Sequence, residues 1–134
     1  MIVKGFAHVC FHVSDLARAE EFYGGKLGFR RAFDFLNDKG QLFGMYFHIS
    51  GRNFLEVFQS EVSPAAPKQA YRHICLEVED IESAARELRA KGLEVSDPKT
   101  GTDRSWQAWL ADPDGNRIEL HCYTPQSKQT PWLR

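Results

Sequence analysis

The sequence has little net charge, few cysteines and no long apolar run, and each shortage excludes a class of protein. Its 17 lysines and arginines nearly balance 18 acids, giving a formal net charge of −1. Proteins that bind nucleic acid or an anionic membrane surface through charge need a basic face, so we expect neither as a partner. No stretch approaches the roughly 20 apolar residues that span a membrane. The first residues enter a strand pattern directly, so we expect no secretory leader.

Cysteine is the second scarce residue. The three cysteines, Cys10, Cys75 and Cys122, are an odd number and lie in apolar strand patterns. This favours buried free thiols in a reducing cytoplasm over a disulfide framework. For Cys10 and Cys75, packing as small hydrophobic side chains is favoured over metal ligation or nucleophilic attack. Since 134 residues can bury a core without disulfides, we expect one domain over residues 1–134.

What the sequence does contain is an internal repeat with an offset of 65 residues. His8-Val-Cys-Phe-His-Val-Ser-Asp-Leu matches His73-Ile-Cys-Leu-Glu-Val-Glu-Asp-Ile. Each half then ends in an apolar run around one acid, Glu56 in the first and Glu119 in the second. Two histidines and two glutamates at equivalent places in a duplicated unit predict a metal site built by pseudo-symmetry.

The first half, at about residues 4–60, has the pattern of a βαβββ unit. Alternating apolar and polar residues predict strands over residues 6–13, 29–36, 42–49 and 54–59, with turns at 37–40 and 50–53. Ser14 or Asp15 is expected to cap a helix that ends at Gly24, Gly25 and Gly28.

The second half, at about residues 70–123, has the same pattern. We expect strands over residues 70–78, 106–111 and 117–122, another beginning at 93–95, and a turn at 112–115. Asp80 is expected to cap a helix that ends near Gly92. Residues 60–69 have no periodicity and predict a linker, and residues 124–134 predict a polar tail that wraps the surface or frays, in which Trp132 is the candidate to dock.

Alternation along the strands predicts which side chains share a face. His8 shares one face with Cys10, and Glu119 shares one with His121, whereas the apolar residues between them should pack on the helices. The sequence therefore predicts an α+β fold in which two βαβββ modules form a cup-shaped mixed β-sheet with helices on the outside. The histidines and glutamates of the repeat would then line the cup.

These motifs together resemble the vicinal oxygen chelate superfamily, which includes glyoxalase I, bleomycin resistance proteins, methylmalonyl-CoA epimerase and extradiol dioxygenases. The resemblance covers residues 5–123 and also rests on Phe22-Tyr23, Leu27-Gly28-Phe29 and Asp112-Pro-Asp-Gly-Asn-Arg-Ile-Glu119-Leu. It implies that four residues are metal ligands, at the positions that glyoxalase I-like members use: His8, Glu56, His73 and Glu119. It also implies a homodimer, because many members close the cup across a dimer.

Two imidazoles and two carboxylates suit one divalent ion, with Ni²⁺, Zn²⁺, Co²⁺, Mn²⁺ and Fe²⁺ as the candidates. Two open positions would let a small-molecule substrate chelate through adjacent oxygens, as in a lyase or isomerase that moves a proton next to a carbonyl. Symmetry with the family favours Glu119 as the first catalytic acid or base and Glu56 as the second. His12 stands where glutathione-using members carry arginine, so the resemblance favours an activity that does not strictly depend on glutathione.

Other residues are weaker candidates, because each also suits an ordinary core or surface role. His121, like His12 and His48, lacks a histidine partner in the repeat, which favours a structural or supporting role around the metal ligands. Seven residues are candidates for the substrate side: Trp109 and Gln107 beside Glu119, Phe47, Phe54 and Phe58 as an apolar wall, and Arg104 and Ser105 at the rim.

Two other functions stay open on the sequence. Bleomycin resistance proteins use this fold without a metal to sequester an antibiotic, and aromatic residues make up 13% of this chain. Fe²⁺ extradiol dioxygenases use two histidines and one glutamate, which leaves Glu56 unexplained. The complete set of four ligand residues favours the metal-dependent lyase or isomerase.

Overall fold

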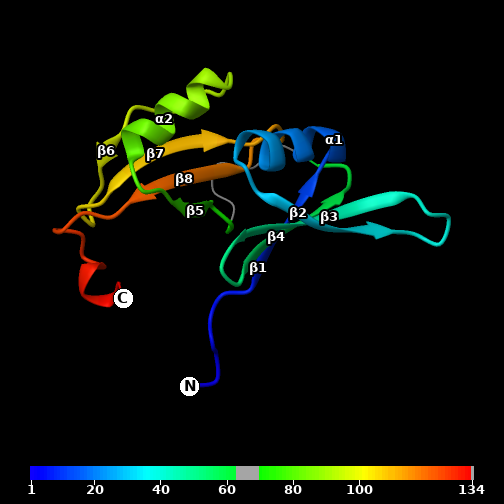
Figure 1. The fold of residues 1–134 in the computed structure, drawn as a ribbon, viewed down its shortest axis with the longest axis horizontal. Helices are drawn as coiled ribbons and strands as arrows, with labels where there is room; N and C mark the ends of the chain where they lie inside the picture. The colour runs from blue at the N-terminus through cyan, green and yellow to red at the C-terminus, as the bar shows by residue number, and fades with distance from the viewer. Residues whose placement is uncertain (63–69, 134) are drawn as a thin grey trace. The chain divides into compact units, whose positions relative to one another are not determined.

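Two compact units divide the computed structural model, Met1–Pro64 and Ala65–Arg134, and we refer to them as module 1 and module 2. Residues 1–62 and 70–133 are described, so most of the predicted linker lies outside the described residues. Each module is a βαβββ unit with one four-stranded mixed sheet and a helix on one face of it (Figure 1). This confirms the predicted α+β fold of two such modules. Among the described helices, none has the length and apolar character to cross a membrane.

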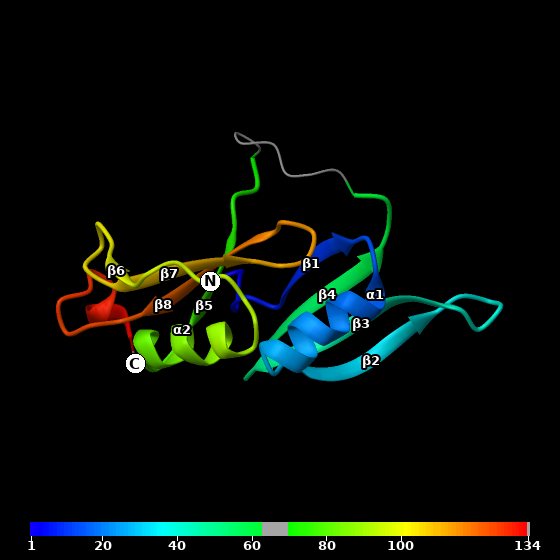
Figure 2. The same cartoon turned by 90° about the horizontal axis from the view of Figure 1, so that it is seen from above.

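Module 1 contains the strands β1 (His8–Val13), β2 (Arg30–Leu36), β3 (Leu42–Ser50) and β4 (Asn53–Gln59). They lie in the order β1-β4-β3-β2, with β1 parallel to β4 and the other pairs antiparallel. The β2–β3 hairpin extends past the helix of its own module (Figures 1 and 2). Its tip therefore leaves Leu36, Leu42 and Phe43 exposed.

The helix of module 1 differs from the prediction at its end. Asp15 caps α1 (Leu16–Ala19), since its carboxylate accepts a hydrogen bond from the Arg18 backbone N–H at 3.0 Å. The chain then continues as a π-helix, η1 (Glu20–Lys26). Gly24 and Gly25 thus lie inside the helix, and Gly28, at φ +80°, follows it. The wide turn buries both Phe22 and Tyr23, which outweighs the helix-breaking tendency of two glycines.

The core of module 1 lies between this helix and one face of the sheet. Phe11, Phe47 and Tyr23 are buried. The centre of the Tyr23 ring lies 6.4 Å from that of Phe11 and 6.2 Å from that of Phe47. Along β4 the buried residues alternate with half-buried ones, as a strand with one covered face requires. The open face of this sheet therefore carries His8, Glu56 and their neighbours, as predicted.

Module 2 contains the strands β5 (Ile74–Glu77), β6 (Lys99–Thr100), β7 (Trp106–Ala111) and β8 (Arg117–Cys122), in the order β5-β8-β7-β6. Its helix, α2 (Ile81–Ala90), begins at the predicted cap, where Asp80 accepts from the Ser83 N–H at 3.0 Å. Ile81, Ala85 and Leu88 bury one face of α2. Gly92, at φ +86°, follows it. Asp112 closes the predicted turn at residues 112–115 by accepting from the Asn116 N–H at 2.8 Å.

The strand predicted to begin at residues 93–95 is wrong, because that segment is irregular. The guanidinium of Arg89 binds the Val95 carbonyl at 2.7 and 3.1 Å, which turns this acceptor toward α2 instead of a neighbouring strand. Ser96 reaches β7 at one residue, where its N–H donates to the Trp109 carbonyl at 2.9 Å and its hydroxyl accepts from the Trp109 N–H at 2.8 Å. The strand β6 forms later and is two residues long. β1 and β5 are likewise shorter than predicted, so His73 immediately precedes β5.

The C-terminal tail is anchored to module 2 through polar residues. Ser127 is buried, its hydroxyl lies 2.7 Å from that of Ser105, and Gln129 donates to Asp103 at 2.6 Å. Trp132, the candidate to dock, ends a short 3₁₀ turn (η2, Thr130–Trp132) with its side chain exposed.

Candidate functional site

In module 1 the pairing of β1 with β4 brings two predicted metal ligands together. Their register places Cys10 opposite Glu56 and His8 opposite Phe54. The Nε2 of His8 then lies 3.9 Å from the Oε1 of Glu56. Two donors bound to one ion at about 2.1 Å lie about 3.0 Å apart when adjacent and about 4.2 Å apart when opposite. The observed separation lies between these two values, so both donors reach one divalent ion only after a side-chain movement of less than about 1 Å.

An aromatic ring lies beside both ligands of module 1. Tyr46 pairs with Glu56 across β3 and β4, and its ring lies 5.6 Å from the imidazole of His8. Phe33 stacks on Tyr46 at 4.6 Å, and Phe54 lies 5.4 Å from it. This cluster gives the ligands of module 1 an apolar surround.

The same cluster continues toward the hairpin. Phe58 lies 5.0 Å from Phe35 and passes directly over Gly44, where an added Cβ would come within 2.5 Å of the Phe58 ring. Gly44 thus has a structural reason to lack a side chain. Phe54 and Phe58 belong to this wall on the open face, as predicted, whereas Phe47 is buried on the opposite face against Tyr23, so its assignment to the wall is wrong.

Module 2 repeats the arrangement of histidine, aromatic ring and acid. Trp109 pairs with Glu119, as Tyr46 pairs with Glu56, and the His73 ring meets Trp109 edge-on at 4.7 Å. The guanidinium of Arg117 lies 4.4 Å from the centre of the same indole. The predicted neighbour Trp109 therefore contacts His73 and pairs with Glu119. Gln107 lies two residues before Trp109 in β7, where it pairs with His121 and its side chain lies next to Gly101.

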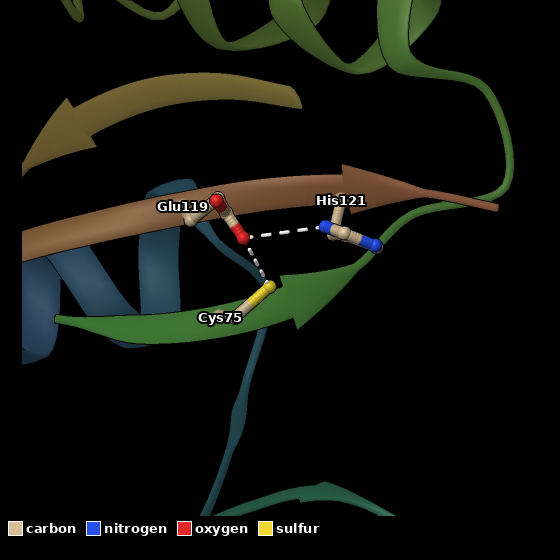
Figure 3. A group of neighbouring side chains, drawn as sticks. All are labelled: Cys75, Glu119 and His121. Carbon is tan, nitrogen blue, oxygen red and sulfur yellow. Dashed lines mark hydrogen bonds and ion pairs between the residues drawn. The ribbon is translucent and has the colours of Figure 1, made fainter. Parts of the chain in front are cut away.

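The carboxylate of Glu119 is held differently from that of Glu56. Its Oε2 accepts a hydrogen bond from the Cys75 thiol at 2.8 Å and lies 3.2 Å from the Nδ1 of His121 (Figure 3). The side chains of Glu119 and His121 are only 12% and 10% exposed. His121 belongs on the open face by alternation, yet it is buried there with its ring 4.8 Å from that of Tyr123.

Asp103 extends this network toward the tail. Its Oδ2 lies 3.5 Å from the Nε2 of His121 and accepts from Gln129 at 2.6 Å, while its Oδ1 accepts from the Ser105 N–H at 3.0 Å. The hydrogen bonds from Gln129 and Ser105 lower the pKa of the Asp103 carboxyl. Ser105 itself is fully buried, so the predicted contact between Ser105 and a substrate at the rim is wrong.

The thiols on the two open faces are bound to acids. Partial burial, followed by the neighbouring Glu56, raises the pKa of Cys10 to about 11. Burial, followed by the hydrogen bond to Glu119, raises the pKa of Cys75 further. As residues both are exposed, so the prediction of buried thiols is wrong. Their strands place them opposite acids on the open face, which is the face that alternation predicts for them.

The sequence did not identify the group formed by Cys75, Glu119 and His121, whose ligand atoms all lie within 4.8 Å of one another. Alternation already placed Glu119 and His121 on one face. The missing information was the register of β5 against β8, which sets Cys75 opposite Glu119. The four predicted ligands draw on both modules, so as a single set they stay a prediction.

Comparison with known proteins finds relatives that match about nine-tenths of this chain. The uncharacterized protein YwkD of Bacillus subtilis (strain 168) is 27% identical over 129 residues, which cover 90% of this chain and 98% of that protein. A glyoxalase family protein from Enterococcus faecalis has a similar structure, with a TM-score of 0.79, 28% identity and coverage of 90% and 99%. TnmS3, an antibiotic binding protein from Streptomyces sp. CB03234, has a TM-score of 0.73, 26% identity and coverage of 92% and 99%.

A family model also matches most of the chain. It spans residues 5–120, which include both histidine motifs and both glutamates. The match agrees with the two βαβββ modules and with the resemblance of their motifs. The chain therefore belongs to the Glyoxalase/Bleomycin resistance protein/Dioxygenase superfamily.

Proposed function

We propose that this protein is a divalent-metal-dependent lyase or isomerase that moves a proton next to a carbonyl group in a small substrate with two adjacent oxygens. One observation carries the proposal: each module places a histidine against an aromatic ring that pairs with a glutamate. The histidine and ring lie 5.6 Å apart in module 1 and 4.7 Å apart in module 2. A duplicated unit that keeps both donor types in the same local setting suits a shared metal site.

In this proposal His8, Glu56, His73 and Glu119 hold the ion. Bound there, a divalent metal supplies Lewis-acid polarisation of the carbonyl, which makes the neighbouring C–H acidic. Glu119 would act as the base that takes this proton, and a protonated Glu56 would give a proton to the adjacent carbon, after which exchange with solvent would return both carboxyl groups to their starting states. Cys75 and His121 hold Oε2 of Glu119, which leaves Oε1 for the ion and, once it is released from the ion, for the proton. The rings of Tyr46 and Phe54 keep water from the module 1 side of the reacting atoms.

The metal content of untagged protein tests the proposal. Cells would be grown with Ni, Co, Mn, Fe and Zn together, and the ions counted in wild type and in a double variant, His73→Ala with Glu119→Gln. We expect at least one ion per chain in wild type, with the ion of the four-residue set lost in the double variant. His12→Ala is the matched control, because His12 lies exposed on β1 outside the set and should leave the count unchanged. No bound ion, with no change in melting temperature on adding metals, would overturn the proposal.

The reaction itself needs a second measurement. Incubation of the loaded protein with 2-oxo and 2-hydroxy carbonyl compounds in D₂O should exchange the hydrogen next to the carbonyl, visible by proton NMR. Glu119→Gln should abolish the exchange, and Glu56→Gln should reduce it. Oxygen consumption with Fe²⁺ and no hydrogen exchange would favour a dioxygenase instead.

We include two further properties in the proposal. Three free thiols suit a reducing cytoplasm, and a metal set drawn from two modules can be completed by a second copy of the chain, which suits a homodimer. Light scattering coupled to size-exclusion chromatography tests the second property. A mass of one chain at micromolar concentration would contradict it.

The aromatic rings of module 1 favour one alternative function, metal-free sequestration of an antibiotic. TnmS3 is an antibiotic binding protein, and the rings of Phe33, Tyr46 and Phe54 offer stacking surface for a planar molecule. Chelator-treated protein would then bind such a drug, as a change in tryptophan and tyrosine fluorescence. Binding that requires the metal would instead support the enzyme.

A further inference from the structure

Module 2 brings together three different metal-binding side chains of which only one belongs to the four-residue set. Cys75 comes from β5, while Glu119 and His121 come from β8 (Figure 3). Their Sγ, carboxylate and imidazole donors all lie within 4.8 Å of one another. We propose that Cys75, Glu119 and His121 form a separate site for one thiophilic divalent ion, such as zinc or cadmium, within module 2 alone.

One of the distances already suits a tetrahedral ion that has a water molecule as its fourth ligand, and the thiol must move to complete the geometry. Bonds of about 2.3 Å to sulfur and about 2.0 Å to nitrogen and oxygen place neighbouring ligands about 3.3 to 3.5 Å apart. The Nδ1 of His121 is 3.2 Å from the Oε2 of Glu119, which already fits. The Sγ of Cys75 is 2.8 Å from the same oxygen and must move by about 0.7 Å. Rotation of the exposed Cys75 side chain supplies that movement.

The surroundings of His121 also suit a ligand. A neutral imidazole has one N–H, yet carboxylates face both of its nitrogens, Glu119 at Nδ1 and Asp103 at Nε2. The Nε2 is buried without a hydrogen bond, since its contact with Asp103 is 3.5 Å long. A cation at Nδ1 would leave the proton on Nε2, where it faces Asp103. Histidine ligands of metals usually donate their second N–H to a carboxylate, a backbone carbonyl or water, and Asp103 lies in that place.

Module 1 provides an internal comparison, because it has no histidine at the position that corresponds to His121. Cys10 lies opposite Glu56 in the same register as Cys75 opposite Glu119. Two residues after Glu56, however, stands Phe58, where module 2 has His121. The thiol and acid are thus common to both modules, whereas the complete set of three donors occurs in module 2.

The site is distinct from the proposed four-residue set. His73 contacts the ring of Trp109 and is not among the three donors. Glu119 is common to both sets, but Cys75 and His121 meet its Oε2, which leaves Oε1 for the other ion. The ligand classes also differ, because a thiolate prefers softer ions than two imidazoles and two carboxylates do.

Cobalt binding to the full chain tests the inference, since a Co²⁺–thiolate bond gives an intense charge-transfer band in the near ultraviolet. The test protein is His8→Ala with His73→Ala, which lacks both imidazoles of the four-residue set. We expect one Co²⁺ per chain with this band, and displacement by an equivalent of Zn²⁺. Cys75→Ser should abolish the band, while Cys10→Ser, the matched thiol of module 1, should retain it. His121→Phe, which copies module 1, should weaken Co²⁺ binding at least tenfold.

Two results would overturn the inference: Co²⁺ binding without the band, or a band that persists in Cys75→Ser. Wild-type protein gives a check that needs no variant, because Zn²⁺ should slow alkylation of Cys75 at least tenfold and leave Cys10 unchanged. Equal protection of both thiols would also contradict it. If wild type binds Co²⁺ without the band, the inference about Cys75 is wrong, while the proposed function is still supported. Conversely, a band in the double variant with no hydrogen exchange by wild type would refute the proposed function alone.

Discussion

In module 1 the repeated glutamate lies among aromatic rings, whereas in module 2 it lies in a polar network. The strand order and the registers of Glu56 and Glu119 with their neighbours correspond in the two modules. The side chains around each acid do not: Phe58 corresponds to His121. Phe54, packed on Tyr46, corresponds to Arg117, packed on Trp109. Duplication has therefore kept the backbone pairing and the acids, while the chemistry of the two open faces has diverged.

Matched core substitutions in the two modules should have the largest effect, and they test whether the modules respond separately. Leu55 and Ile118 precede the two acids and both are fully buried. Truncation of either, as Leu55→Ala or Ile118→Ala, should lower the free energy of unfolding by about 2–5 kcal/mol, because it removes buried methyl groups and leaves a cavity. Hydrogen exchange with mass spectrometry should show the larger loss of protection in the module that carries the substitution. Equal losses in both modules would show that the two units do not respond separately.

Thiol reactivity sharpens the comparison at the acids. A pKa of about 11 at Cys10 leaves a thiolate fraction at pH 8 roughly 100-fold below that of an ordinary thiol, and the pKa of Cys75 is raised further. Iodoacetamide should therefore modify Cys10 slowly and Cys75 more slowly still. Glu56→Gln should speed modification of Cys10 without affecting Cys75. Rates at pH 8 that match a free cysteine would contradict the hydrogen-bonded geometry.

The same shift makes a prediction for stability. Because the pKa of Cys10 is higher in the folded protein than the ordinary value of 9.0, folding favours the protonated thiol. Its contribution to stability is complete below pH 9 and is lost as the pH rises through about 11. Urea unfolding across that interval should show a smaller decline for Cys10→Ser than for wild type. Parallel declines would mean that this thiol does not contribute.

Glycine substitutions test how tightly the aromatic face of module 1 is packed. A Cβ on Gly44 would lie 2.5 Å from the Phe58 ring and 2.9 Å from the Val57 carbonyl, so Gly44→Ala should cost about 1–3 kcal/mol in chemical denaturation. Adding Phe58→Ala should recover part of that loss. Gly101→Ala in module 2 is the control, because its Cβ would meet only the flexible end of Gln107, at 3.2 Å. A cost at Gly101 equal to that at Gly44 would contradict this account.

The smallest expected effect concerns Arg117, which occupies the place of Phe54. Arg117→Ala should lower stability by about 0.5–1 kcal/mol, because an exposed cation packed on an indole contributes about that much. Arg117→Phe, which copies module 1, should recover most of it by stacking on Trp109. Thermal unfolding resolves both changes. A larger loss in Arg117→Phe than in Arg117→Ala would show that Trp109 requires a cation.

Local patterns explain why so much of the fold was predictable. Alternation identified the open faces, and Asp15 and Asp80 marked both helix starts because an aspartate cap acts on the residues immediately after it. Interactions that the local pattern does not show explain the two wrong predictions, the strand at residues 93–95 and the end of the first helix. Arg89 removes the Val95 carbonyl from strand pairing, and burial of Phe22 and Tyr23 holds the π-helix.

The candidate site was predictable to a similar extent. The repeat located the histidines and acids, and alternation along β7 located the aromatic neighbour Trp109. It did not show that Glu119 accepts from Cys75 or that His121 is buried beside it, since both depend on the register of β5 with β8.

The parallel pairing of β1 with β4, and of β5 with β8, also has a consequence for the order of folding. Within module 1 the β2–β3 and β3–β4 hairpins join neighbours in sequence, whereas His8 must find Phe54 across nearly the whole module. Closing so long a loop is slow compared with forming hairpins. The strand that carries His8 and Cys10, like β5 with Cys75, should therefore dock last. A chain with its hairpins complete but these edge strands still unpaired would already have most of its sheet and both glutamates, without the histidine and the thiols that lie beside them.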